Sequence, residues 1–151
     1  ITPIASVQNR YNIRDRESED VLRACESDQV AFLPYFPLQG FGFTSGSNAL
    51  GAVGQTHDAT PAQIALAWLL ARSPVMLPIP GTSSLDHLEE NIAAASIGLT
   101  DKDLERLDAI NPRLSGMLDK LAGPLSESGK QRVREAAGPL RRLWARLRFW
   151  D

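Results

Sequence analysis

The stretch from Leu77 to Asn91 limits the possible folds more than any other part of this sequence. A short apolar run over residues 75–79 ends at Pro80, and a segment with helical spacing follows the turn. An apolar run without polar alternation is typical of a buried parallel strand. Ser83 or Ser84 can cap the helix, whose free N–H groups and dipole favour an anion at the turn. The stretch predicts strand, turn and helix, as a phosphate site or as an ordinary βα connection.

Two further strands are predicted upstream of this stretch. Residues 4–11 form a short β-prone run, and residues 30–35 form a second apolar run that ends in a glycine-rich loop. Helical spacing that begins at Asp15 separates the two runs, and residues 48–56 form a weaker helical segment. Strands that alternate with helices predict an α/β fold with a parallel sheet and right-handed crossovers. Three such strands do not close a barrel.

The clearest helix start in the chain lies at Thr60. Thr60 has the position of an N-cap, Pro61 occupies the first helical position and Gln63 completes a capping box. The residues that follow are apolar over most of the helix surface, which predicts a largely buried helix. A second start, with Thr100 three residues before Asp103, predicts a last helix that ends near residue 110.

Composition places the chain among ordinary soluble proteins. Its 151 residues, 43% of them hydrophobic, are enough for one domain with a core. No run approaches the roughly 20 apolar residues of a transmembrane helix, so we expect no transmembrane segment, and the single cysteine fits a cytoplasmic location. The single Cys25 excludes an internal disulfide and a cysteine metal cluster, and two histidines are too few for a metal site. The chain begins at Ile1 and not at Met, which indicates a piece of a longer sequence.

The net charge of −2 conceals a boundary between two segments. Residues 1–111 carry 7 Lys and Arg against 14 Asp and Glu, whereas residues 112–151 carry 9 against 4. The first segment therefore has a charge of −7 and the second a charge of +5. This contrast predicts two differently built segments that meet near Asn111.

The second segment, residues 112–151, predicts a basic tail that is partly an amphipathic helix. Four apolar residues recur there at helical spacing: Leu140, Leu143, Trp144 and Leu147. Three interpretations stay open, namely docking on the body of the protein, contact with a partner or membrane surface, and translated sequence with no selected role. A nucleic-acid partner is not expected, because the basic residues are confined to the tail and the body is acidic.

Four ordered segments of the chain resemble the aldo-keto reductases, and the bacterial members in particular. They are Val7–Asn12, Ala31–Leu38, Thr60–Trp68 and Ile79–Asn91, and the similarity covers residues 1–110. The resemblance implies strands six, seven and eight of a (β/α)8 TIM barrel. Because such a barrel typically needs ~250 residues, it also implies that the chain is the C-terminal portion of an enzyme.

The family function implied is reversible hydride transfer between NADPH and the carbonyl carbon of an aldehyde or ketone. By resemblance, Gln8 bonds the nicotinamide carboxamide and Tyr35 is the ring on which the nicotinamide stacks. The segment that wraps the pyrophosphate matches Pro37, Leu38 and Gly40. Phe36 stands here in place of the small Ser that is common in the family.

The adenosine end of the cofactor is implied by the opening stretch. The matching positions are Gly81, Thr82, Ser83, His87, Glu90 and Asn91. The family commonly has Lys and Arg where this chain has Gly81 and His87, and these cations bind the 2′-phosphate. Their replacement predicts a weaker preference for NADPH, so that NADH also becomes a possible cofactor.

No catalytic residue is assigned in this chain. The family's catalytic Asp, Tyr, Lys and His lie on strands that precede the ones seen here, and without the Tyr donor the proton transfer lacks its acid. The chain alone is therefore not expected to reduce carbonyls. Two functions stay open: the NADP(H)-binding portion of an oxidoreductase, and a non-catalytic nucleotide-binding module, regulatory subunit or truncated remnant.

Overall fold

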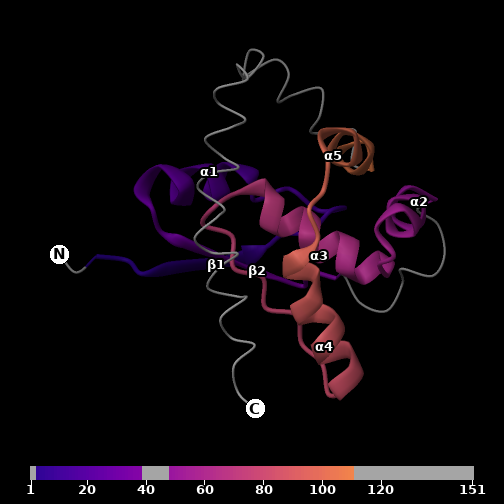
Figure 1. Cartoon of the computed structure of the whole chain (residues 1–151). Helices are drawn as coiled ribbons and strands as arrows, with labels where there is room; N and C mark the ends of the chain where they lie inside the picture. The colour runs from indigo at the N-terminus through magenta and orange to yellow at the C-terminus, as the bar shows by residue number, and fades with distance from the viewer. Residues whose placement is uncertain (1–2, 39–47, 111–151) are drawn as a thin grey trace.

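The computed structural model of the chain describes residues 3–38 and 48–110 (Figure 1). The glycine-rich loop with Gly40, the basic tail and its predicted amphipathic helix lie outside the described residues. No helix in the described ranges has the length and apolar content needed to cross a bilayer.

The first two predicted strands are confirmed, and they pair side by side. Strands β1 (Ser6–Arg10) and β2 (Ala31–Tyr35) run parallel and are connected through helix α1 (Glu19–Asp28). The sequence had predicted a helix that begins at Asp15, but helix α1 begins at Glu19. The reason is a turn after β1, in which the backbone of Asn12 exchanges two hydrogen bonds with that of Asp15.

The prediction of a third strand over residues 75–79 is wrong, because this segment forms no strand. The segment does run parallel to β2, as predicted. The segment makes a single parallel bridge, between Met76 and Phe32 of β2. The Phe32 N–H donates to the carbonyl of Val75 at 2.8 Å, and the N–H of Leu77 donates to the Phe32 carbonyl at 2.8 Å. The segment therefore lies beside β2 without forming a ladder.

A proline in β2 explains why this ladder stops after one bridge. The next donor toward residues 75–79 would be the N–H of residue 34, and Pro34 has no N–H. The expected burial of the run is only partly correct, because Met76 is buried whereas Ile79 is 42% exposed.

The remaining described elements are helical, and Figure 1 shows them to the right of β1 and β2. They are α2 (Asn48–His57), α3 (Pro61–Arg72), α4 (Leu85–Ala93), the 3₁₀ turn Ala94–Ser96 and α5 (Asp101–Asp108). Both predicted capping boxes are present, at Thr60 of α3 and Thr100 of α5. Helix α3 contacts α2, α4 and the 3₁₀ turn, and its residues 64–69 are buried, as the sequence predicted.

Trp68 in the middle of α3 is the largest fully buried side chain among the described residues. The ring of Tyr11, just after β1, stacks on it with centroids 6.1 Å apart and planes 10° apart. Its Nε1 donates to Oδ1 of Asp108 in α5 at 3.1 Å, and the guanidinium of Arg16 lies 4.6 Å from the indole centroid. Arg16 also pairs with Asp108 at 3.1 Å. One indole therefore joins the end of β1, α3 and α5.

A second buried group of charges lies beside this ring. The carboxylate of Glu19 accepts a hydrogen bond from the Tyr11 hydroxyl and pairs with the guanidinium of Arg72. Burial raises the pKa of Tyr11 well above its ordinary value. Burial lowers the pKa of Arg16, whereas the negative charge of Glu19 beside Arg72 helps to raise the pKa of that guanidinium against the effect of burial. The group is held together as paired charges, which is how buried ions are tolerated.

Asp103 connects α5 to α2. Its carboxylate accepts the N–H and the hydroxyl of Thr100 in the capping box and lies 3.0 Å from Nε2 of His57, at the end of α2. Burial acts to raise the pKa of Asp103, but the hydrogen bonds from Thr100 and His57 outweigh it and lower the pKa to about 2.

Replacing Asp103 should change how stability depends on pH. A carboxyl whose pKa is lower in the folded state stabilises it above the unfolded pKa, and this contribution is lost as the pH falls through the folded value. Asp103→Asn should reduce the free energy of unfolding at neutral pH by about 1–2 kcal/mol. Between about pH 4 and pH 2 the variant should lose less stability than the parent, because the ionisable group is gone.

Urea unfolding followed by circular dichroism at neutral pH and at about pH 3 measures both effects. Glu105→Gln, an exposed change on the same helix, is the matched control and should leave the stability difference between the two pH values unaltered. An equal loss of stability for Asp103→Asn and its parent between these pH values would contradict the assignment.

Candidate functional site

The first part of the candidate site is the exposed face of the two-stranded sheet. In the register, Gln8 lies opposite Leu33 and Arg10 lies opposite Tyr35. Alternation along a strand therefore places Gln8 and Tyr35 on the same face, one pleat apart. The opposite face carries the buried Phe32. Gln8 is exposed and Tyr35 is 37% exposed, so an amide and an aromatic ring are both accessible on this face near the carboxyl ends of the strands.

The segment that follows β2, residues 36–38, is fixed against the core and against the turn after β1. Pro37 is buried and Leu38 is half-buried against the core, so the start of the connection after β2 is fixed. The Nδ2 of Asn12 donates to the carbonyl of Phe36 at 3.1 Å, which connects the ends of both strands. Gly40, the next residue predicted for the site, lies outside the described residues.

The second part is the turn before α4. Of the two predicted caps, Ser84 is the one used, and its Oγ accepts the N–H of His87 at 3.4 Å. The hydroxyl of Thr82 accepts the N–H of Ser84 at 3.1 Å and stabilises the turn. Gly81, Thr82 and Ser83 are exposed, so the turn presents hydroxyl and amide groups to solvent at the positive end of a helix.

The electrostatics of this turn are unusual for an anion site. No Lys or Arg occurs between residues 73 and 101, and α4 carries Asp86, Glu89 and Glu90. The exposed His87 is therefore the side chain of this stretch that can become cationic. A phosphate here would be bound chiefly by neutral donors and the helix dipole.

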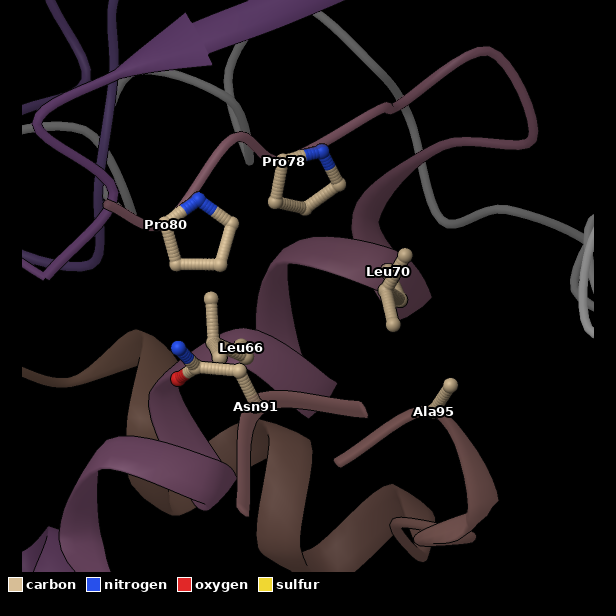
Figure 2. A pocket seen from close by; sticks show the side chains of 6 residues that line it. All are labelled: Leu66, Leu70, Pro78, Pro80, Asn91 and Ala95. Atoms are coloured by element: carbon tan, nitrogen blue, oxygen red, sulfur yellow. The ribbon is translucent and has the colours of Figure 1, made fainter. Parts of the chain in front are cut away.

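The end of α4 lies over a small apolar pocket (Figure 2). Its lining comes from α3, from the proline segment, from α4 and from the 3₁₀ turn that follows it: Leu66, Leu70, Pro78, Pro80, Asn91 and Ala95. Figure 2 shows the side chain of Asn91 beside Leu66, with its amide directed toward Pro80. The helix is held in this place by Gln63, whose Nε2 donates to the Glu90 carbonyl at 3.1 Å.

The structure thus gathers the predicted residues into two groups. Gln8 and Tyr35 share the sheet face, and residues 81–91 form the turn and helix, which the bridge of Met76 to β2 connects to the sheet. Sequence reasoning missed the buried Asn12 and the backbone of Phe36, which has a φ of 52°. The pattern of Asn12 and Asp15 is a turn signal that could have identified the first of these.

Comparisons with known proteins bear on both groups. The profile of the Aldo/keto reductase family matches residues 1–112. An uncharacterized oxidoreductase of Schizosaccharomyces pombe is 48% identical over 106 residues, which is 70% of this chain and 35% of that protein. Pyridoxine 4-dehydrogenase of Escherichia coli is 47% identical over 74% of this chain and 38% of its own length. The chain spans little more than a third of these relatives.

Solved structures agree with the sequence relatives. The thermostable aldo-keto reductase Tm1743 in complex with epalrestat is 36% identical, with a TM-score of 0.65 over 72% of this chain and 40% of that one. An aldo-keto reductase of Klebsiella pneumoniae in complex with NADPH is 30% identical, with a TM-score of 0.65 over 72% of this chain and 39% of its own. These neighbours are (β/α)8 barrels, and the present chain matches a portion of that barrel.

Proposed function

The chain belongs to the aldo/keto reductase family, and we propose that it is the NADP(H)-binding portion of an oxidoreductase that transfers hydride between a nicotinamide cofactor and an aldehyde or ketone. The observation that carries this proposal is the placement of Gln8 and Tyr35 on one sheet face near the carboxyl ends of parallel strands. Barrel enzymes build their active sites at this end. The NADPH-bound Klebsiella pneumoniae relative supports the choice of cofactor.

Within the barrel, β1, β2 and the bridged segment 75–79 correspond to strands six, seven and eight in this proposal. Residues 1–111 form the barrel portion and residues 112–151 a separate tail. The end of the family match at residue 112 supports that boundary. The opposite charges of the two segments, −7 and +5, favour docking of the tail on the body. A cytoplasmic location is also proposed, on the basis of the single cysteine.

At the nicotinamide end, Gln8 and Tyr35 have complementary roles. The amide of Gln8 offers both a donor and an acceptor, which matches the carboxamide of the nicotinamide. The exposed ring of Tyr35 stacks on one face of the nicotinamide and leaves the other open to substrate, which fixes the face of hydride transfer. The bound cofactor supplies the hydride, and this chain supplies its position.

At the adenosine end, the proposed contacts come from the turn and α4. Thr82, Ser83 and the N-terminal N–H groups of α4 bind the 2′-phosphate together with His87 in its protonated form. The remaining contacts are made by Glu90 and Asn91 with the adenine, by Pro37, Leu38 and Gly40 with the pyrophosphate, and by Gly81 with the phosphate through its backbone.

The role of Tyr35 is tested by titrating NADPH into the full chain in a calorimeter. Tyr35→Ala should weaken binding by at least roughly 3- to 10-fold, because ring stacking contributes about 0.5–1.5 kcal/mol beyond the area buried and that area is lost as well. Ile4→Ala removes another exposed apolar side chain, 69% exposed and near the opposite end of β1, and should leave the affinity unchanged. Absence of NADPH binding by the parent chain would contradict the proposed function.

Cofactor selectivity provides a second test. The parent should prefer NADPH over NADH by less than about a thousandfold, because the turn lacks permanent cations. Gly81→Lys should strengthen NADPH binding roughly tenfold or more and leave NADH binding unchanged, since each charge-assisted hydrogen bond contributes about 1.5–3 kcal/mol. A side chain fits here, because no atom lies within 4 Å of a Cβ built on Gly81.

The measurement is the ratio of the two dissociation constants for the parent and for Gly81→Lys. Gly98→Lys, at another glycine with open space around its Cβ, is the matched control for added charge. A parental ratio above about a thousandfold, or equal gains for both cofactors in Gly81→Lys, would show that the 2′-phosphate does not bind at this turn.

A further inference from the structure

Phe36 adopts a backbone conformation that is costly for its residue type. Its φ is 52°, in the left-handed region, where a bulky side chain is a true outlier. Gln29 and Asp58 also have positive φ among the described non-glycine residues. Gln29 does so as the C-cap of α1, and Asp is enriched in this region, so both have ordinary local reasons. Phe36 follows a strand, and its conformation needs another cause.

The peptide group after Phe36 is held by the side chain of Asn12, which is 1% exposed. Its Oδ1 accepts the N–H groups of Arg14 and Asp15, each at 3.0 Å, so the amide is fixed by the turn after β1. The other end of the same amide, Nδ2, donates to the Phe36 carbonyl at 3.1 Å. Asn12 therefore uses both ends of a buried amide to hold the peptide group after Phe36 against the end of β1.

The held conformation places the aromatic ring of Phe36 beside Tyr35. The two rings meet edge-on with centroids 5.5 Å apart and planes at 65°. Glycine adopts this φ at no steric cost, so an aromatic residue here stands against the local backbone preference. Local strain of this kind that persists next to a binding face suggests a role for this ring.

We infer that Phe36 forms a second aromatic wall of the nicotinamide site and that Asn12 is the positioning residue that sets it. The ligand class is a nicotinamide ring with its ribose, which would contact Tyr35 by its face and Phe36 at its side. This inference rests on the proposed function, because Tyr35 is the other wall. It assigns to Phe36 an apolar contact that excludes water from the nicotinamide end, while the adenosine end is untouched.

The test separates the two ends of the cofactor by using reduced nicotinamide mononucleotide, NADPH and adenosine 2′,5′-bisphosphate as probes of the full chain. Phe36→Gly should weaken binding of the mononucleotide and of NADPH by a similar factor, roughly 3- to 10-fold for one lost aromatic contact. Binding of the bisphosphate should not change. Because glycine suits the left-handed backbone, the melting temperature of Phe36→Gly should not fall. Phe36→Tyr keeps the ring and should retain affinity.

Gln29→Gly is the matched control, since it relieves a similar φ of 57° at the end of α1, away from the proposed site. It should leave all three affinities unchanged. Asn12→Asp keeps the acceptor for Arg14 and Asp15 but removes the donor to Phe36, and it should reduce mononucleotide affinity without affecting bisphosphate affinity. If that variant does not fold, Phe36→Gly and Phe36→Tyr still decide.

The outcomes are distinguishable. If the parent binds none of the three probes, the proposed function fails and the inference fails with it. If the parent binds the mononucleotide and Phe36→Gly binds it equally well, the inference is wrong while the proposed function stands. Equal losses for the mononucleotide and the bisphosphate would show that Phe36 supports the fold and is no wall of the nicotinamide site.

Discussion

The packing of Trp68 is the interaction on which the rest of the described structure depends. Its indole stacks on Tyr11, lies beneath the guanidinium of Arg16 and donates a hydrogen bond to Asp108. These partners come from the end of β1, from the turn before α1 and from the end of α5. Removing a buried Trp typically costs 3–5 kcal/mol. Loss of this ring would therefore destabilise the packing of α3 and α5 together with the end of β1, the strand that carries Gln8.

Contacts with this core position the residues of the proposed site. Tyr11 is held by the indole and by Glu19. The next residue, Asn12, donates a hydrogen bond to the carbonyl of Phe36 and so connects this core to the end of β2. On the other side, the capping residue Gln63 of α3 reaches the Glu90 carbonyl and sets α4 against the same helix. Both halves of the proposed cofactor site are therefore fixed to α3, although they lie on opposite sides of it in the sequence.

The sequence predicted those parts of the fold whose causes are local. Thr60, Pro61 and Gln63 form the predicted capping box, and apolar runs located β1 and β2. The run at residues 75–79 was apolar enough to predict a strand, but Pro34 of β2 has no N–H to donate to it, so the pairing stops after one bridge. The buried pairing of Glu19 and Arg72 had no sequence signal, because the partners are 53 residues apart.

The candidate site shows the same division. Placing Gln8 and Tyr35 on a common face follows from strand alternation and register, and the turn before α4 from its serines. The left-handed backbone of Phe36 could not be predicted, since no local rule places a bulky residue there and the amide that holds its carbonyl belongs to Asn12, 24 residues away. Gly40 belongs to a stretch outside the described residues.

Hydrogen–deuterium exchange of the full chain with and without NADPH tests the central claim most directly, namely that one polypeptide carries both ends of a nicotinamide cofactor site. We predict slower exchange on NADPH addition in residues 6–10, 35–38 and 81–91, with no change in α1 or α5. Protection confined to one of the two groups, or spread over α1 and α5 without them, would contradict it.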